Sequence, residues 1–171
     1  ARTPWHESYC ANAYLNYFLP LNTARLTAVM RDVNRFLPQT SVSEVHDFGA
    51  GLGAVQWALE ALSWEAKPLR AIEAERSAVE IYRTLLPVLD ARWPVEFTRP
   101  SEPRPGALAT FSYSFLEMQN SVPDLSAFEH LLIVEPSTQE RGRALMEWRA
   151  KLMKSGFSPL APCTHELACP L

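Results

Sequence analysis

Cysteine and long apolar runs are scarce in this sequence, and each shortage excludes a class of protein. Three cysteines in 171 residues are too few for a disulfide framework. No apolar run approaches the roughly 20 residues that a bilayer-spanning helix needs, and the N-terminus lacks the basic start and continuous apolar segment of a secretory signal. We therefore expect an intracellular protein that does not enter a membrane.

An excess of positive charge is missing too. The formal net charge is −3 at pH 7, which excludes a domain that binds nucleic acid through bulk electrostatics alone but is compatible with a local basic patch. The hydrophobic share of 47% and the charged share of 20% are ordinary for a soluble globular chain. At this length the chain can bury a core of its own.

What the sequence does contain is a concentrated glycine motif within residues 42–54, VSEVHDFGAGLGA. Its first half holds apolar β-formers and predicts a buried strand that ends at Phe48. The glycines that follow allow a positive φ or the close approach of a ligand; they are Gly49, Gly51 and Gly53. A helix is expected over residues 55–62, so the free amides of the turn would lie at a helix N-terminus, where polar or anionic groups bind.

This strand, turn and helix are typical of nucleotide-binding doubly wound folds, and two cofactors are compatible with them. GAGLGA fits the dinucleotide pattern G-x-G-x-x-G/A, which would indicate a nicotinamide-dependent dehydrogenase. Asp47 favours another interpretation. Asp-x-Gly-x-Gly at the end of a first strand resembles the first motif of class I S-adenosylmethionine-dependent methyltransferases, in which the acid and the glycines frame the methionine moiety. An ordinary tight turn is the third alternative.

The rest of the chain alternates between helical and strand patterns. We expect an N-terminal helical pair, with one helix ending at Pro20 and a second running from an N-cap at Asn22 to Leu37. Four more strands and their connecting helices follow: the strands cover 69–74, 93–98, 107–111 and 130–135, and the helices cover 78–89, 123–130 and 137–154. This order predicts an α/β fold with a parallel sheet of about five strands, helices on both faces and ligands at the carboxyl ends of the strands.

Candidate ligand-binding residues follow from that placement. Glu75, which we expect just beyond the second strand, would accept hydrogen bonds from ribose hydroxyls; Glu73 is the alternative, and a solvated helix-capping acid is the plainer explanation. Tyr113, at the end of the fourth strand, would stack on a base or form core or cofactor wall. The predicted cofactor-binding set is Asp47, Gly49, Ala50, Gly51, Gly53, Glu75, Ser112 and Tyr113, and no catalytic residue is assigned.

Four stretches carry a closer resemblance: residues 13–29 (AYLNYFLPLNTARLTAV), 46–59 (HDFGAGLGAVQWAL), 112–118 (SYSFLEM), and the pair LLIVEPSTQERG and APCTHELACPL near the end. In these the chain resembles the methyltransferase-like family of mitochondrial small-ribosomal-subunit assembly proteins and their bacterial relatives. The resemblance implies a Rossmann-like class I methyltransferase fold, S-adenosylmethionine as cofactor, and the small ribosomal subunit and its RNA as partners of a monomer. The compartment would be a mitochondrial matrix or a bacterial cytoplasm.

The same resemblance implies a metal site. In that family Cys163 and Cys169 look like the first half of a four-cysteine iron–sulfur site whose other ligands lie farther along, so the cluster is expected in a longer parent only. Two surface thiols are the plainer alternative. We expect a fragment with incomplete C-terminal strands, divided into a helical extension (1–38), a cofactor-binding domain (39–161) and the start of a cysteine-containing metal-binding tail (162–171).

Three functions remain open from the sequence. The first is an S-adenosylmethionine-binding protein of small-subunit assembly, in which the methyl donor serves structure or regulation more than turnover. The second is an active RNA methyltransferase. The third is a dehydrogenase that uses GAGLGA for a dinucleotide, against which Asp47 argues.

Overall fold

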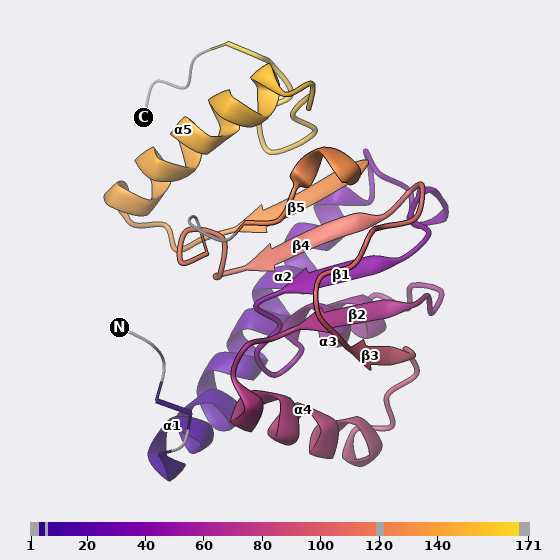
Figure 1. The fold of residues 1–171 in the computed structure, drawn as a ribbon, viewed down its shortest axis with the longest axis vertical. Helices are drawn as coiled ribbons and strands as arrows, with labels where there is room; N and C mark the ends of the chain where they lie inside the picture. The colour runs from indigo at the N-terminus through magenta and orange to yellow at the C-terminus, as the bar shows by residue number, and fades with distance from the viewer. Residues whose placement is uncertain (1–3, 6, 119–121, 168–171) are drawn as a thin grey trace.

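The computed structural model describes residues 4–5, 7–118 and 122–167 of the chain. Its centre is a five-stranded sheet of order β3-β2-β1-β4-β5 in which every neighbouring pair is parallel (Figure 1). The strands are β1 (Val45–Phe48), β2 (Leu69–Ile72), β3 (Val95–Phe97), β4 (Leu108–Ser112) and β5 (His130–Val134). The predicted α/β fold with five parallel strands is confirmed.

The strand order reverses between β1 and β4, and this reversal distributes the helices. Right-handed crossovers from β1 towards β3 place α3 (Ala54–Ala61) and α4 (Arg76–Val88) on one face, whereas the connections from β4 onwards use the other. One core forms among α2, α3, α4 and the first face, and a second among the opposite face, the 3-10 turn Leu125–Ala127 and α5 (Gln139–Lys154). Helical cover on both faces was predicted and is observed.

Alternation along β1 shows how the sequence supplies both cores. Val45 faces the α3 side, while Phe48 faces the α5 side and stacks on Phe111 with ring centroids 4.9 Å apart. Every residue of β1 is buried, as expected for a central parallel strand covered on both faces. Within the described ranges, no helix combines the length and apolar character that crossing a membrane requires.

The predicted break at Pro20 is wrong. The chain stays helical from Ser8 to Val33, as α1 (Ser8–Ala13), a π-helical turn (Tyr14–Phe18) and α2 (Leu19–Val33). Proline normally ends a helix because its ring meets the carbonyl four residues earlier and it has no N–H to donate. Here the π turn, whose Leu19 amide bonds to the Tyr14 carbonyl, widens the helix just before Pro20 and relieves that clash. Asn22 therefore lies inside a helix instead of capping one.

Two further boundaries differ from the sequence prediction. β2 ends at Ile72, whose carbonyl accepts from the amides of Gly49 (2.8 Å) and Ala50 (3.3 Å) as β1 passes into the glycine turn. Glu73 is therefore the first residue past the strand, and Glu75 becomes the N-cap residue of α4. The short helix expected over 123–130 is one 3-10 turn, which begins where the Asp124 carboxylate accepts from the Ser126 amide.

The edge of the sheet where the strands begin contains a buried acid. Glu44 is fully buried, accepts from the backbone amide of Arg104 and from His46 Nε2 (2.9 Å each), and lies 3.5 Å from Arg70 Nε. Burial raises the pKa of its carboxyl, but the Arg104 amide, His46 and Arg70 outweigh it and hold that pKa below its usual value. Glu44 therefore ties β1 to β2 and to the loop before β4.

We expect Glu44→Ala to lower the free energy of unfolding by about 3 kcal/mol, because it leaves buried polar groups without their partner. Glu96→Ala is the matched control: Glu96 pairs with the same Arg70 at 3.0 Å, but 63% of its side chain is exposed, so its loss should cost less than about 1 kcal/mol. Urea unfolding followed by circular dichroism measures both. Equal costs would show that Glu44 is no more important than a surface ion pair.

Candidate functional site

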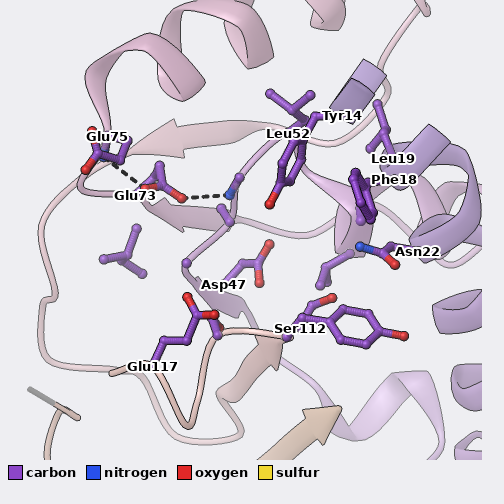
Figure 2. A pocket seen from close by; sticks show the side chains of 18 of the residues that line it. Tyr14, Phe18, Leu19, Asn22, Asp47, Leu52, Glu73, Glu75, Ser112 and Glu117 are labelled. Carbon is purple, nitrogen blue, oxygen red and sulfur yellow. Dashed lines mark hydrogen bonds between the residues drawn. The ribbon is translucent and has the colours of Figure 1, made fainter. Parts of the chain in front are cut away.

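A pocket of about 850 Å³ opens at the carboxyl ends of β1, β2 and β4 (Figure 2). This is the point where the strand order reverses, which is where open α/β sheets bind ligands. Seven of the eight predicted site residues line it: Asp47, Gly49, Ala50, Gly51, Glu75, Ser112 and Tyr113. Gly53, the eighth, does not.

The glycines of the turn have different duties. Gly53 is the N-cap residue of α3 at φ +81°, and a Cβ there would lie 2.1 Å from the Tyr82 ring, so its role is packing. Gly51 has φ +53° and open space where its Cβ would be. A side chain at Gly51 would therefore enter space that a ligand can use. Of Gly51 and Gly53, only Gly51 matches the close approach of backbone and ligand that the sequence predicts.

Asp47 lies at the centre of the pocket in an unusual state for a carboxyl group. It is 1% exposed; Oδ1 accepts from Thr110 Oγ1 at 2.9 Å, and Oδ2 has no hydrogen-bond partner among the described residues. Burial raises the pKa of Asp47 to about 7; the nearby Glu73 carboxylate adds to the rise and the Thr110 hydrogen bond opposes it. Ser112 Oγ, in the same pocket, is also buried and unpaired within the described part. Two polar atoms are thus available to a ligand.

Glu73 holds the glycine turn in place. Its Oε2 accepts from the Gly51 amide and its Oε1 from the Glu75 amide, both at 2.9 Å, as the dashed lines of Figure 2 mark. An amide of the turn therefore already has an anionic acceptor. A phosphate at this turn would have to displace a carboxylate and lie among several others, so the site is unsuited to a pyrophosphate group.

The charges that line the pocket are mostly negative. Glu117 joins Asp47, Glu73 and Glu75 in the lining. Arg141, the lining residue of opposite charge, is engaged with Glu135 (3.2 Å) and Glu117 (3.7 Å). A ligand with a positive centre is therefore favoured over an anion.

The end of β4 forms the remaining wall. Tyr113 has φ +61°, a conformation that costs free energy for a bulky residue, and its amide donates to the Val134 carbonyl at 2.7 Å. Ser114 Oγ donates to the Phe48 carbonyl and ties this bend to the end of β1. The bend places Ser112 and Tyr113 in the lining of the same pocket as the glycine turn.

Sequence reasoning missed one side of the pocket. The N-terminal helix and the segment just before it contribute a group of lining residues that were not among the predicted site residues and are mostly aromatic: Trp5, Tyr14, Phe18, Leu19 and Asn22. The signal was present as a concentration of aromatic residues before Pro20. It could not be interpreted without the path of the helix, which depends on the π turn.

The predicted metal ligands are not brought together by the described residues. Cys163 is exposed, and Cys169 lies outside the described residues. Within the described ranges, no group of three His, Cys, Asp or Glu side chains is placed to hold a metal ion. This part of the chain therefore does not fit an iron–sulfur cluster by itself.

The raised pKa of Asp47 predicts a pH dependence of stability. Its folded pKa of about 7 exceeds the unfolded value near 3.9, so the folded state holds the proton more tightly and stability falls as pH rises from about 4 to about 7, then levels off. Asp47→Asn should remove this fall and make the protein more stable at pH 8, by up to about 4 kcal/mol. Urea unfolding across this pH range measures it.

Glu117→Gln is the control for that experiment, because Glu117 lies in the same pocket with 65% of its side chain exposed. It should leave the pH profile unchanged. If Asp47→Asn keeps the parent profile, Asp47 is not the group that titrates.

Three of the solved structures to which the chain is similar are the following. A candidate S-adenosyl-L-methionine-dependent methyltransferase from Methanococcus maripaludis has a TM-score of 0.49 and 15% identity, over 85% of this chain and 68% of its own. A candidate RNA methyltransferase from Pyrococcus horikoshii has a TM-score of 0.47 and 15% identity (78% and 67%). Protein arginine methyltransferase 10 from Arabidopsis thaliana has a TM-score of 0.47 and 14% identity (88% and 48%).

These similarities are too low to carry an argument about chemistry, and no curated protein matches the chain. The family comparison is decisive instead. The model of the family described as mitochondrial small ribosomal subunit Rsm22 matches residues 8–171, nearly the whole chain. It confirms the resemblance inferred from the four sequence stretches, and the chain therefore belongs to the Rsm22 family.

Proposed function

We propose that this protein binds S-adenosylmethionine in the pocket at the carboxyl ends of β1, β2 and β4, and that it acts with the small ribosomal subunit. The observation that carries the proposal is the buried Asp47 carboxyl group, one oxygen of which has no hydrogen-bond partner among the described residues, in a mostly acidic pocket. S-adenosylmethionine has an ammonium group, a sulfonium centre and two ribose hydroxyls. The ammonium group and the ribose hydroxyls are hydrogen-bond donors that suit carboxylate acceptors.

The described residues fit this cofactor group by group. Asp47 Oδ2 is available to the ammonium group, and the open space at Gly51 accommodates the methionine chain. Glu73 and Glu75 lie between the end of β2 and the start of α4. In doubly wound folds, an acid at this position accepts hydrogen bonds from ribose hydroxyls. Ser112 and Tyr113 complete the wall at the end of β4.

The hydrogen bonds of Glu73 argue against the dehydrogenase alternative. A dinucleotide needs the turn amides for its pyrophosphate, whereas Glu73 occupies the Gly51 amide and its neighbours add negative charge.

Membership of the Rsm22 family supports the ribosomal part of the proposal, since the family is described by the mitochondrial small subunit. We propose a monomer that works in the mitochondrial matrix or, in bacterial members, the cytoplasm, with small-subunit RNA as the partner. An iron–sulfur cluster on Cys163 and Cys169 stays a prediction, supported by the preference of thiolates for such clusters. Iron and sulfide analysis of an anaerobically expressed longer parent, with and without Cys163→Ser, tests it.

Isothermal titration calorimetry tests the cofactor. We expect S-adenosylmethionine to bind and NAD to give no heat of binding. Gly51→Asn should weaken S-adenosylmethionine binding by at least about tenfold, because asparagine tolerates a positive φ while its side chain enters the pocket. Gly156→Asn is the control, since Gly156 also has a positive φ and open space but does not line the pocket. Unchanged affinity in the Gly51 variant would show that the ligand lies elsewhere.

A tritiated methyl-transfer assay on small-subunit RNA shows whether the protein transfers the methyl group or only binds S-adenosylmethionine for structure or regulation. Methyl transfer depends mainly on placing donor and acceptor in line, and the end of β4 reads Ser112-Tyr113-Ser114-Phe115 instead of an Asn-Pro-Pro-Tyr motif that holds a flipped base. We expect the donor to strengthen RNA binding in a filter assay without methyl incorporation. Incorporation of tritiated methyl groups above the level of an Asp47→Asn control would establish methyltransferase activity.

A further inference from the structure

We infer that the aromatic side chains of the π-helical turn recognise the methylsulfonium cation, so that the protein distinguishes the charged donor from its neutral thioether product, S-adenosylhomocysteine. The residues concerned are Tyr14 and Phe18, which line the pocket opposite the ribose-side acids. This inference rests on the proposed cofactor and adds which of its two charge states the site prefers.

The two rings belong to an ordered aromatic cluster. Trp5 is 8% exposed and packs with Leu52 of the glycine turn. The centroid of its ring is 4.3 Å from that of Tyr14, and the Tyr14 and Phe18 centroids are 5.0 Å apart. The Tyr14 ring therefore packs against two other aromatic rings, and Trp5 connects it to the turn that would hold the methionine chain.

The π turn decides which side chains of this helix reach the pocket. Its wider winding, marked by the bond from the Leu19 amide to the Tyr14 carbonyl, puts Tyr14, Phe18 and Leu19 in the lining. Tyr17, in the same turn, is 61% exposed and does not line the pocket. Single π turns inside α-helices occur often at functional sites, and here the turn sets an aromatic wall beside the acids.

The composition of the two walls specifies the charge of the ligand. Figure 2 shows Tyr14 and Phe18 on one side, Glu73 and Glu75 on the other, and Asp47 between them. The negative faces of aromatic rings attract a desolvated cation, as in the aromatic cages that bind quaternary ammonium groups. A sulfonium has the same charge and no hydrogen-bond donor, so it needs this kind of partner. The thioether product lacks the charge and gains only apolar contact.

Calorimetry with S-adenosylmethionine and S-adenosylhomocysteine tests the inference through the ratio of the two affinities. Phe18→Leu and Tyr14→Leu keep an apolar wall without a ring; each should weaken donor binding about three- to tenfold and change product binding by less than about twofold. Tyr14→Phe keeps the ring, so it should keep the parent ratio. Tyr9→Leu is the matched control and should change neither affinity, because Tyr9 lies on the same helix, is 65% exposed and does not line the pocket.

The possible outcomes separate the inference from the proposed function. Equal losses for donor and product in the Leu variants would make the wall merely apolar and overturn the inference, while the cofactor assignment stands. A parent that binds neither ligand overturns both. Thermal unfolding of each variant accompanies the titrations, and Phe18→Leu carries the ring test if Tyr14→Leu does not fold.

Discussion

The contact on which the pocket depends is the pair of hydrogen bonds that Glu73 accepts from the amides of Gly51 and Glu75. One carboxylate thereby joins the turn after β1 to the start of α4, and so fixes the separation of the two strand ends between which a ligand would lie. The same contact sets the electrostatics, because it uses a turn amide that would otherwise attract an anion. The glycine turn, whose sequence resembles a phosphate-binding turn, is thus part of an acidic pocket.

The N-terminal helix depends on a second constraint, the proline at position 20. Accommodating Pro20 without ending the helix requires the π turn, and the π turn in turn directs Tyr14 and Phe18 into the pocket. The helix continues as α2, whose Leu26 and Met30 are buried in the core shared with α3. The aromatic wall is therefore attached to the domain through a well-packed helix.

Much of the fold could be predicted from the sequence because its signals are local. The apolar β-formers around Val45, the apolar run around Leu132 and the glycines after Phe48 specify strands and a turn without reference to the rest of the chain. The wrong element boundaries arose where a residue distant in the sequence determines where an element ends. β2 ends at Ile72 as β1 passes into the glycine turn, and this makes Glu73 the residue that bridges the turn. The continuation through Pro20 depends on a change of helical winding that residue periodicity does not reveal.

The state of Asp47 links the stability of the domain to its ligand. This carboxyl is buried, and one of its oxygens has no partner in the part of the chain that the structure describes. Burial disfavours the charged form and raises the pKa to about 7, and each pKa unit corresponds to about 1.36 kcal/mol. A cation beside Asp47 would lower that pKa and recover the lost free energy on binding. By linkage, such a ligand would release a proton at neutral pH and stabilise the fold at the turn that Glu73 holds. A neutral or anionic ligand in the same place would leave that free energy unrecovered.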